Sequence, residues 1–107
     1  MKKPLLLFAI GCFLVAGMGC HKNEPIPVAN FTLYHSSHDT VAPDTVTFKN
    51  LSQNAPTFEW DFGDKKSSTE TNPVHIYTVP GNYDVVLKAF SDSRQQWAIK
   101  DQTIKLK

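Results

Sequence analysis

The chain has 107 residues, which is enough for one domain at most, and its 11 basic residues nearly balance its 10 acidic ones. A protein that binds nucleic acid through the phosphates needs clustered lysines and arginines. No such cluster occurs, since Lys65-Lys66 is only a pair, so composition and charge exclude nucleic acid as the expected partner.

The first 19 residues have the pattern of an export signal. Met1-Lys2-Lys3 is basic, an apolar run over residues 5–16 follows, and small residues lead up to Cys20, after which the sequence becomes polar. The run is shorter than the roughly 20 apolar residues that span a bilayer, but it has the length of the hydrophobic region of a signal peptide. Residues 1–19 are therefore predicted to be a signal peptide and the rest of the chain to be exported.

The residues before Cys20 resemble the lipobox of bacterial lipoproteins. In that motif a cysteine after small residues is acylated and becomes the new N-terminus; Gly19 fits the motif, whereas Gly17 stands where Leu is usual. The resemblance implies lipidation of Cys20, and two or more acyl chains anchor a protein stably to a membrane. The chain is therefore expected at the cell envelope, attached to the outer membrane of a Gram-negative bacterium. The alternative is an ordinary secretory signal that leaves Cys20 as a lone cysteine.

Cleavage before Cys20 changes what can hold the domain together. Lys2 and Lys3 leave with the signal, so nine basic residues remain against ten acidic ones, a net charge of −1. One cysteine remains, so no disulfide can form within the chain and the domain depends on its apolar core. Residues 20–26 are polar and contain proline, which predicts an extended tether before a domain over residues 27–107. The charged tether faintly resembles surface-export signals of some lipoproteins, and both a periplasmic and a surface position stay open.

Alternation of apolar and polar residues predicts short strands, and no helical period follows the signal. Residues 35–40 and 65–72 lack an apolar face and are predicted to be loops, and a bulge is expected near Lys100-Asp101 in the last strand. Seven short runs at 8–12-residue spacing are typical of an all-β sandwich. The predicted strands cover residues 28–34, 45–51, 58–62, 74–77, 83–90 and 97–106, the last divided in two by the bulge.

Three motifs occur in order: Trp60-Asp61-Phe62-Gly63-Asp64, then Asn72-Pro73-Val74-His75-Ile76-Tyr77, then Gly81-Asn82-Tyr83 leading into an alternating strand. Together they resemble the polycystic-kidney-disease (PKD) domain over residues 27–106. The resemblance implies an immunoglobulin-like β-sandwich of about seven strands, with Trp60 packed between the sheets and Tyr83 placed as a tyrosine corner. Lys65 stands where the family usually has Gly, and a slightly different turn is expected because Lys tolerates positive φ poorly. The motif residues expected to form the scaffold are Trp60, Asp61, Phe62, Gly63, Asp64, His75, Tyr77, Gly81 and Tyr83.

No arrangement of residues predicts catalysis. There is no nucleophile elbow, no histidine pair with metal spacing and no phosphate-binding glycine loop, so the protein is predicted to be a non-enzyme without catalytic residues or cofactor. His75 is interpreted as a structural histidine that bonds the Asp-containing turn, and Asp61 and Asp64 as acceptors for backbone N–H groups. The alternative for the two aspartates is a calcium site, which some PKD domains have near strand ends and which needs six or more oxygen ligands. His35 and His38 are predicted to lie in a solvated loop.

The expected function is binding. Phe90 and Trp97 are the candidate binding residues, because exposed aromatic rings on a β-sandwich suit stacking on sugars or docking on a protein; alternatively, Trp97 packs over a sandwich edge and Phe90 fills the second face. The chain is thus expected to be a lipid-anchored binding or adhesion module for protein or glycan. The alternatives are a structural spacer or assembly subunit of an envelope complex, and an accessory subunit in extracellular degradation of glycan or protein.

Overall fold

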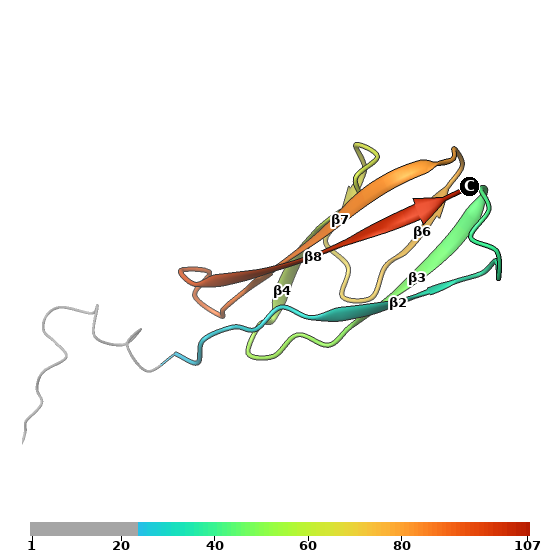
Figure 1. Ribbon diagram of the computed structural model, residues 1–107. Coiled ribbons are helices and arrows are strands. Elements are labelled where there is room, and N and C mark those ends of the chain that lie inside the picture. Colours follow the sequence, from blue (N-terminus) through green and yellow to red (C-terminus); the bar gives the residue numbers. More distant parts are fainter. Residues whose placement is uncertain (1–23) are drawn as a thin grey trace, which may run out of the picture.

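The computed structural model describes residues 24–107, which form two packed β-sheets (Figure 1). The predicted signal peptide, Cys20 and the first part of the predicted tether lie outside the described residues. Within residues 24–107, no helix is long and apolar enough to cross a membrane. The strands are β2 (Phe31–His35), β3 (Asp44–Asn50), β4 (Thr57–Asp61), β5 (Ser67–Ser68), β6 (Val74–Tyr77), β7 (Gly81–Phe90) and β8 (Trp97–Leu106).

The strands are antiparallel throughout and form two layers. One sheet has the order β2-β3-β6, and the other has the order β5-β4-β7-β8. An isolated bridge between Val28 and Gln53 continues the register of β2 and β3 toward the N-terminus. This arrangement confirms the prediction of an all-β sandwich with seven strands.

The last strand differs from its prediction. β8 pairs with β7 without interruption over the full ten residues of both strands, so the expected bulge near Lys100 is wrong. Lys100 lies opposite the buried Leu87 and on its side of the sheet, yet it is exposed because β8 is an edge strand. The bulge was predicted because Lys100, a polar residue, stands at an inward position and interrupts the alternation of apolar and polar residues. The seventh strand is instead β5, inside the segment 65–72 that was predicted to be a loop.

The C-terminal end of β8 is joined to the loop between β2 and β3. The N–H of Lys107 donates to the carbonyl of Thr40 at 2.9 Å, and the N–H of Ala42 donates to the carbonyl of Lys107 at 3.0 Å. These two bonds link the edge of the four-stranded sheet to a connection of the other sheet.

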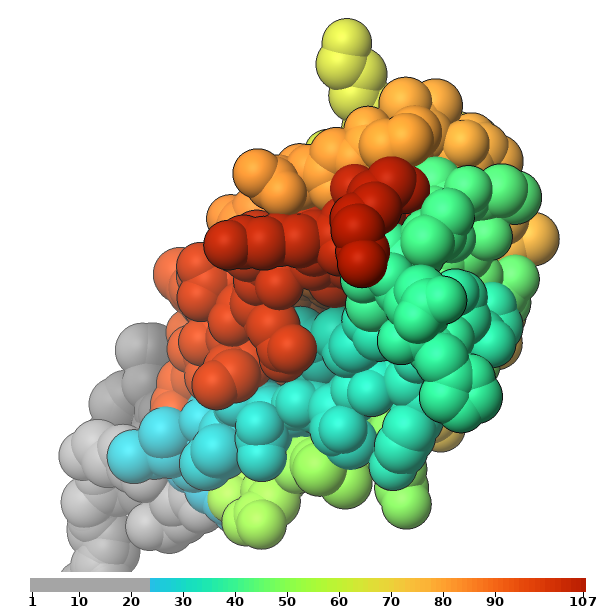
Figure 2. Space-filling model, turned by 45° about the vertical axis from the view of Figure 1, so that its right-hand side comes forward, coloured from blue at the N-terminus to red at the C-terminus, as the bar shows by residue number. Residues whose placement is uncertain are grey.

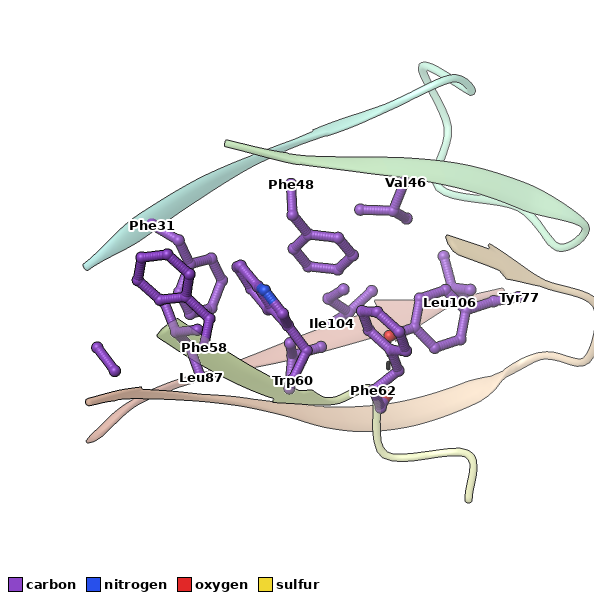
Figure 3. Close-up of a cluster of buried hydrophobic side chains, with 12 residues drawn as sticks. Phe31, Val46, Phe48, Phe58, Trp60, Phe62, Tyr77, Leu87, Ile104 and Leu106 are labelled. Carbon is purple, nitrogen blue, oxygen red and sulfur yellow. Dashed lines mark hydrogen bonds between the residues drawn. The ribbon is translucent and has the colours of Figure 1, made fainter. Parts of the chain in front are cut away.

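Aromatic rings from both sheets fill the interior (Figure 3). Trp60 is only 1% exposed; its ring centroid lies 5.1 Å from that of Phe31 and 5.2 Å from that of Phe48. Its indole N–H donates to the carbonyl of Glu70 at 2.8 Å, so the one polar atom of the side chain is satisfied. The buried cluster comprises Phe31, Val46, Phe48, Phe58, Trp60, Phe62, Tyr77, Val85, Leu87, Ala89, Ile104 and Leu106.

Two tyrosines bond the backbone from inside the sandwich. The hydroxyl of Tyr77 donates to the carbonyl of Phe62 at 2.8 Å, and the hydroxyl of Tyr83 donates to the carbonyl of Val79, four residues upstream. Burial, together with the nearby Asp64, raises the pKa of Tyr77 well above its ordinary value. The Tyr77 hydroxyl therefore stays protonated and acts as a donor, and no buried side-chain nitrogen or oxygen within residues 24–107 lacks a partner.

The turn after β4 adopts left-handed backbone conformations at two positions. Gly63 has a φ of 84° and Lys65 a φ of 71°. The expectation that Lys65 would avoid positive φ is wrong. Two hydrogen bonds hold the turn around it: the N–H of Phe62 donates to the carbonyl of Lys66 at 3.0 Å, and the N–H of Lys66 donates to the Asp64 carboxylate at 3.2 Å.

The described part of the predicted tether contacts the domain instead of standing away from it. The carboxylate of Glu24 accepts hydrogen bonds from the N–H and the hydroxyl of Ser93, both at 2.7 Å. The carbonyl of Ile26 accepts a bond from the Asn54 side chain at 3.1 Å. Residues 24–26 are thus fixed against the connections that follow β3 and β7, a contact over 69 residues that no local pattern reveals.

Candidate functional site

The outer face of the four-stranded sheet carries the chemically varied side chains. Residues paired across antiparallel strands point to the same side, so the register builds this face in rows. One row joins Glu59, Lys88 and Ile99 across β4, β7 and β8. On β4 and β7 the inward-facing neighbours are buried core residues, which hold the rows rigidly in place.

A groove of about 480 Å³ runs over this face beside β4. We name it the β4 groove. Carboxylates lie on the β4 side at Glu59 and Asp61, an ammonium group lies on β7 at Lys88, and hydroxyls come from β5 and the residue after it. This set can both donate and accept hydrogen bonds. Its lining residues are Glu59, Trp60, Asp61, Ser67, Ser68, Thr69, Val86 and Lys88.

A second hollow of about 420 Å³ adjoins the β4 groove and shares Glu59 and Thr69 with it. Arg94 lines this hollow and donates to the hydroxyl of Thr57 at 3.1 Å and to the carboxylate of Glu59 at 3.3 Å. Both charged side chains are about half exposed, so the ion pair itself contributes little stability. Its role is geometric: it holds a guanidinium group in the hollow beside the β4 groove.

The structure places the two aromatic residues proposed from the sequence opposite each other on β7 and β8, but they differ in exposure. Phe90 is only 8% exposed, and the guanidinium carbon of Arg94 lies 4.0 Å from its ring centroid. Of the two alternatives for Phe90, the burial agrees with a ring that fills the second face and not with an exposed stacking surface, because Arg94 covers the ring. Trp97 is 56% exposed, with the ammonium group of Lys88 at 5.7 Å from its ring centroid. Trp97 lines neither the β4 groove nor the adjoining hollow.

The Asp and His residues of the first two motifs bond the turn after β4. Asp61 accepts from the N–H of Gly63 at 2.9 Å, and one oxygen of Asp64 accepts from the N–H of Lys66. The other oxygen of Asp64 lies 2.7 Å from Nε2 of His75. The His75 ring stacks on Phe62 with the centroids 4.1 Å apart. Residues 24–107 contain no group of three or more His, Cys, Asp or Glu side chains placed to hold a metal ion.

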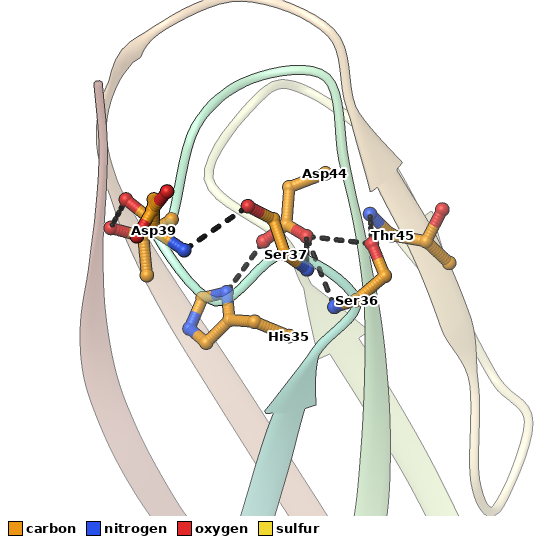
Figure 4. Close-up of polar contacts among 7 residues, drawn as sticks. His35, Ser36, Ser37, Asp39, Asp44 and Thr45 are labelled. Atoms are coloured by element: carbon orange, nitrogen blue, oxygen red, sulfur yellow. Dashed lines mark hydrogen bonds and ion pairs between the residues drawn. The ribbon is translucent and has the colours of Figure 1, made fainter.

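A second polar cluster, which the sequence did not indicate, surrounds Asp44 (Figure 4). Asp44 is 1% exposed, and its carboxylate lies 2.5 Å from Nδ1 of His35. Its other oxygen accepts from the N–H and hydroxyl of Ser36 and from the N–H of Ser37, at 2.9–3.1 Å. His35 is the last residue of β2 and not a loop residue, so its placement in a solvated loop is wrong. The side chain of Asp44 thus orders the loop between β2 and β3.

Acidification is expected to weaken this cluster. Burial alone would raise the pKa of Asp44, but the hydrogen bonds from His35, Ser36 and Ser37 outweigh burial and hold the pKa below its ordinary value of 3.8. The folded state therefore favours the carboxylate, whose contribution to stability is present above the unfolded-state pKa and is lost as the pH falls through the folded-state pKa. We expect the free energy of unfolding, measured by urea titration, to fall from about pH 5 downward.

Asp44→Asn isolates this contribution. The amide NH₂ would face hydrogen-bond donors, so at neutral pH we expect a loss of about 1–3 kcal/mol in the free energy of unfolding. The loss should shrink as the pH falls, because protonation has already weakened the same bonds in the unchanged protein. Asp92→Asn, at an exposed position in the β7–β8 connection, is the control. An unchanged difference between the two proteins from pH 7 to pH 2 would contradict the assignment.

Comparison with known proteins identifies the fold family. The family model of the PKD domain matches residues 23–106. The chain belongs to the PKD domain family. Among solved structures, it is similar to the PKD1 domain of the Vibrio cholerae metalloprotease PrtV, at 31% identity and a TM-score of 0.63, over 77% of this chain and 98% of that one. The predicted identity of the three motifs is thereby confirmed.

Two further relatives belong to larger proteins. A structure from work on the promiscuous specificity of carbohydrate-binding modules of the β-sandwich superfamily is 29% identical with a TM-score of 0.66, over 78% of this chain and 35% of that one. Collagenase ColQ1 of Bacillus cereus (strain Q1) is 49% identical over 37 residues, which is 35% of this chain and 4% of the collagenase. This PKD domain therefore corresponds to a small part of the collagenase that it matches.

Proposed function

We propose that the mature chain is a lipid-anchored, non-catalytic binding module of the cell envelope and that it binds glycan in the β4 groove. The observation that carries the proposal is the lining of the groove, in which carboxylates, an ammonium group and several hydroxyls are interleaved. Sugar hydroxyls both donate and accept hydrogen bonds, so this mixture is complementary to them. The similarity to a structure from work on carbohydrate-binding modules supports the same ligand class.

The anchor is part of the proposal and has its own support in the sequence. The apolar run, the small residues and Cys20 lie in the order of a lipoprotein signal. Cys20→Ala should release the protein from the membrane fraction of cells that process lipoproteins. Retention of this variant in membranes would contradict the anchor while leaving the groove untouched.

Binding to a glycan array tests the groove directly. Glu59→Gln removes a charge from the lining and keeps the length of the side chain, and Lys88→Gln removes a charge and shortens the side chain by one atom. Because a hydrogen bond to a charged group contributes about 1.5–3 kcal/mol, each change should weaken binding about 10- to 100-fold.

Lys105→Gln is the matched control, since Lys105 lies on the same outer face two strands from β4 and does not line the groove. Equal binding by all the variants would refute the groove as the site.

A second candidate function, as an assembly subunit of an envelope complex, has one favourable observation. The outer face of the β2-β3-β6 sheet exposes Tyr34, Val74 and Ile76, each at 55–60%. Tyr34 and Val74 both lie opposite Thr47, so they form one row across the sheet. Recovery of one stoichiometric membrane protein with the intact chain, lost in Val74→Lys and kept in Lys88→Gln, would favour assembly over glycan binding.

A further inference from the structure

One end of the sandwich gathers the N-terminal segment and the hairpin between β7 and β8. We define this hairpin end as residues 24–28, 51–56 and 91–97. Glu24 bonds Ser93, and Ile26 bonds Asn54, so the chain enters the domain at this end. In Figure 1 the start of the blue segment lies beside the tip of the hairpin, and Figure 2 shows the blue and orange-red residues meeting on one side of the molecule.

The sequence leaves little chain between the proposed anchor and this end. Three residues separate Cys20 from Glu24, and the Glu24 carboxylate is held by two hydrogen bonds of 2.7 Å. Four extended steps of about 3.3–3.6 Å span about 14 Å at most. If acyl chains on Cys20 lie in the bilayer, Glu24 therefore lies within about 14 Å of the anchored residue, which keeps the hairpin end close to the lipid headgroups.

The side chains at the hairpin end suit that position. Trp97 is 56% exposed and Ile26 is 73% exposed, and neither lines the β4 groove or the hollow beside it. Tryptophan is enriched at membrane interfaces, where its apolar ring and polar N–H are both satisfied. Arg94 lies over the ring of Phe90 with its apolar stem and ends in a cationic group of the kind that binds lipid phosphates. The acidic side chains of Glu24, Glu59 and Asp92 lie in the same region and offset the positive charge of Arg94. This surface is therefore expected to set the orientation of the domain on the membrane and not to add membrane affinity.

We propose that the hairpin end is a membrane-contacting surface, with Trp97 and Ile26 at the level of the lipid headgroups. The inference rests on the proposed lipidation of Cys20, which supplies the membrane affinity. The Glu24–Ser93 contact sets the orientation because it joins the anchored segment rigidly to the hairpin. The β4 groove then opens along the side of a domain that stands on the membrane.

The test uses the intact protein purified from membranes and reconstituted into phosphatidylcholine–phosphatidylglycerol vesicles. Mass spectrometry first establishes whether Cys20 carries acyl chains; a peptide without them overturns both the anchor and the membrane surface. In the acylated protein, lipids brominated near the headgroup should quench the emission of Trp97. The quenching should disappear in Trp97→Phe, which retains only the buried Trp60.

Two variants separate orientation from attachment. Val41→Trp in the Trp97→Phe background places an indole at an exposed site in the loop at the opposite end, and its emission should not be quenched. Glu24→Ala should reduce quenching of Trp97 while the protein stays bound to the vesicles. Unquenched Trp97 in the acylated protein, or equal quenching at positions 41 and 97, overturns the proposed surface and leaves the anchor standing. Loss of glycan binding in Trp97→Phe without any quenching by lipid would instead assign the side chain to a ligand.

Discussion

Replacement of Trp60 by alanine is expected to lower the free energy of unfolding by about 3–5 kcal/mol, the range for truncating a large buried aromatic side chain. The indole is 1% exposed, contacts Phe31 and Phe48 of the opposite sheet, and bonds the carbonyl of Glu70. Its loss leaves a cavity between the sheets and a carbonyl without its donor. Because small domains have a free energy of unfolding of only about 5–15 kcal/mol, this loss is a large fraction of the stability of the domain.

Urea titration followed by circular dichroism measures this effect. Trp97→Ala is the matched control, since it removes the same side chain from a position that is 56% exposed and should cost clearly less, about 1 kcal/mol. Trp60→Phe keeps a ring in the core but loses the N–H donor, so its loss of stability should be smaller than that of Trp60→Ala and larger than that of Trp97→Ala. This variant gives the measurement if Trp60→Ala does not fold. A Trp60→Ala protein with an unchanged unfolding midpoint would disprove the placement of Trp60 at the centre of the core.

Gly63→Ala, which adds a single methyl group in the turn after β4, is expected to lower the stability of the domain strongly. Gly63 has a φ of 84°, and an added Cβ would lie 2.7 Å from the carbonyl oxygen and 2.8 Å from the nitrogen of Asp84. Those atoms belong to the backbone of β7, so the strand and the turn would have to move apart. The left-handed conformation alone costs a residue with a side chain about 1–2 kcal/mol, and the clash adds to that cost.

The thermal midpoint of unfolding should therefore fall by several degrees in Gly63→Ala. Lys65→Gly provides a control of opposite sign in the same turn, because Lys65 also has a positive φ but is exposed. This change should leave stability unchanged or raise it slightly, since glycine adopts that conformation without steric cost. A fall in stability in Lys65→Gly as large as that in Gly63→Ala would show that the backbone angles are not the cause.

The strands were predictable where one face of a strand is continuously buried. Val85, Leu87 and Ala89 stand at every second position, which places them on one face of a strand, and all three are buried in β7. The strand predictions were wrong where the position of a strand in the sheet, or its shortness, hides the alternation of apolar and polar residues. Lys100 occupies an inward position that is exposed at a sheet edge, and the two-residue β5 carries no pattern of its own.

The candidate site was less predictable because it depends on contacts between distant residues. Phe90 reads as an outward aromatic residue, and only the folded hairpin brings Arg94 over its ring. Asp44 looks like an ordinary turn residue, and its burial follows from His35 and Ser36 closing over it. The β4 groove likewise combines residues of three strands, so no single stretch of sequence carries it.

The uncovered edge of β8 has a consequence for self-association. A ten-residue edge strand offers unpaired N–H and C=O groups that could template a second chain, and Trp97 and Ile99 add exposed apolar surface to it. Lys100, Asp101 and Lys105 are exposed along this edge, and charged side chains oppose the addition of a strand. The bonds of Lys107 to the β2–β3 loop occupy its far end. The edge charges thus oppose the formation of intermolecular sheet along the free edge of β8.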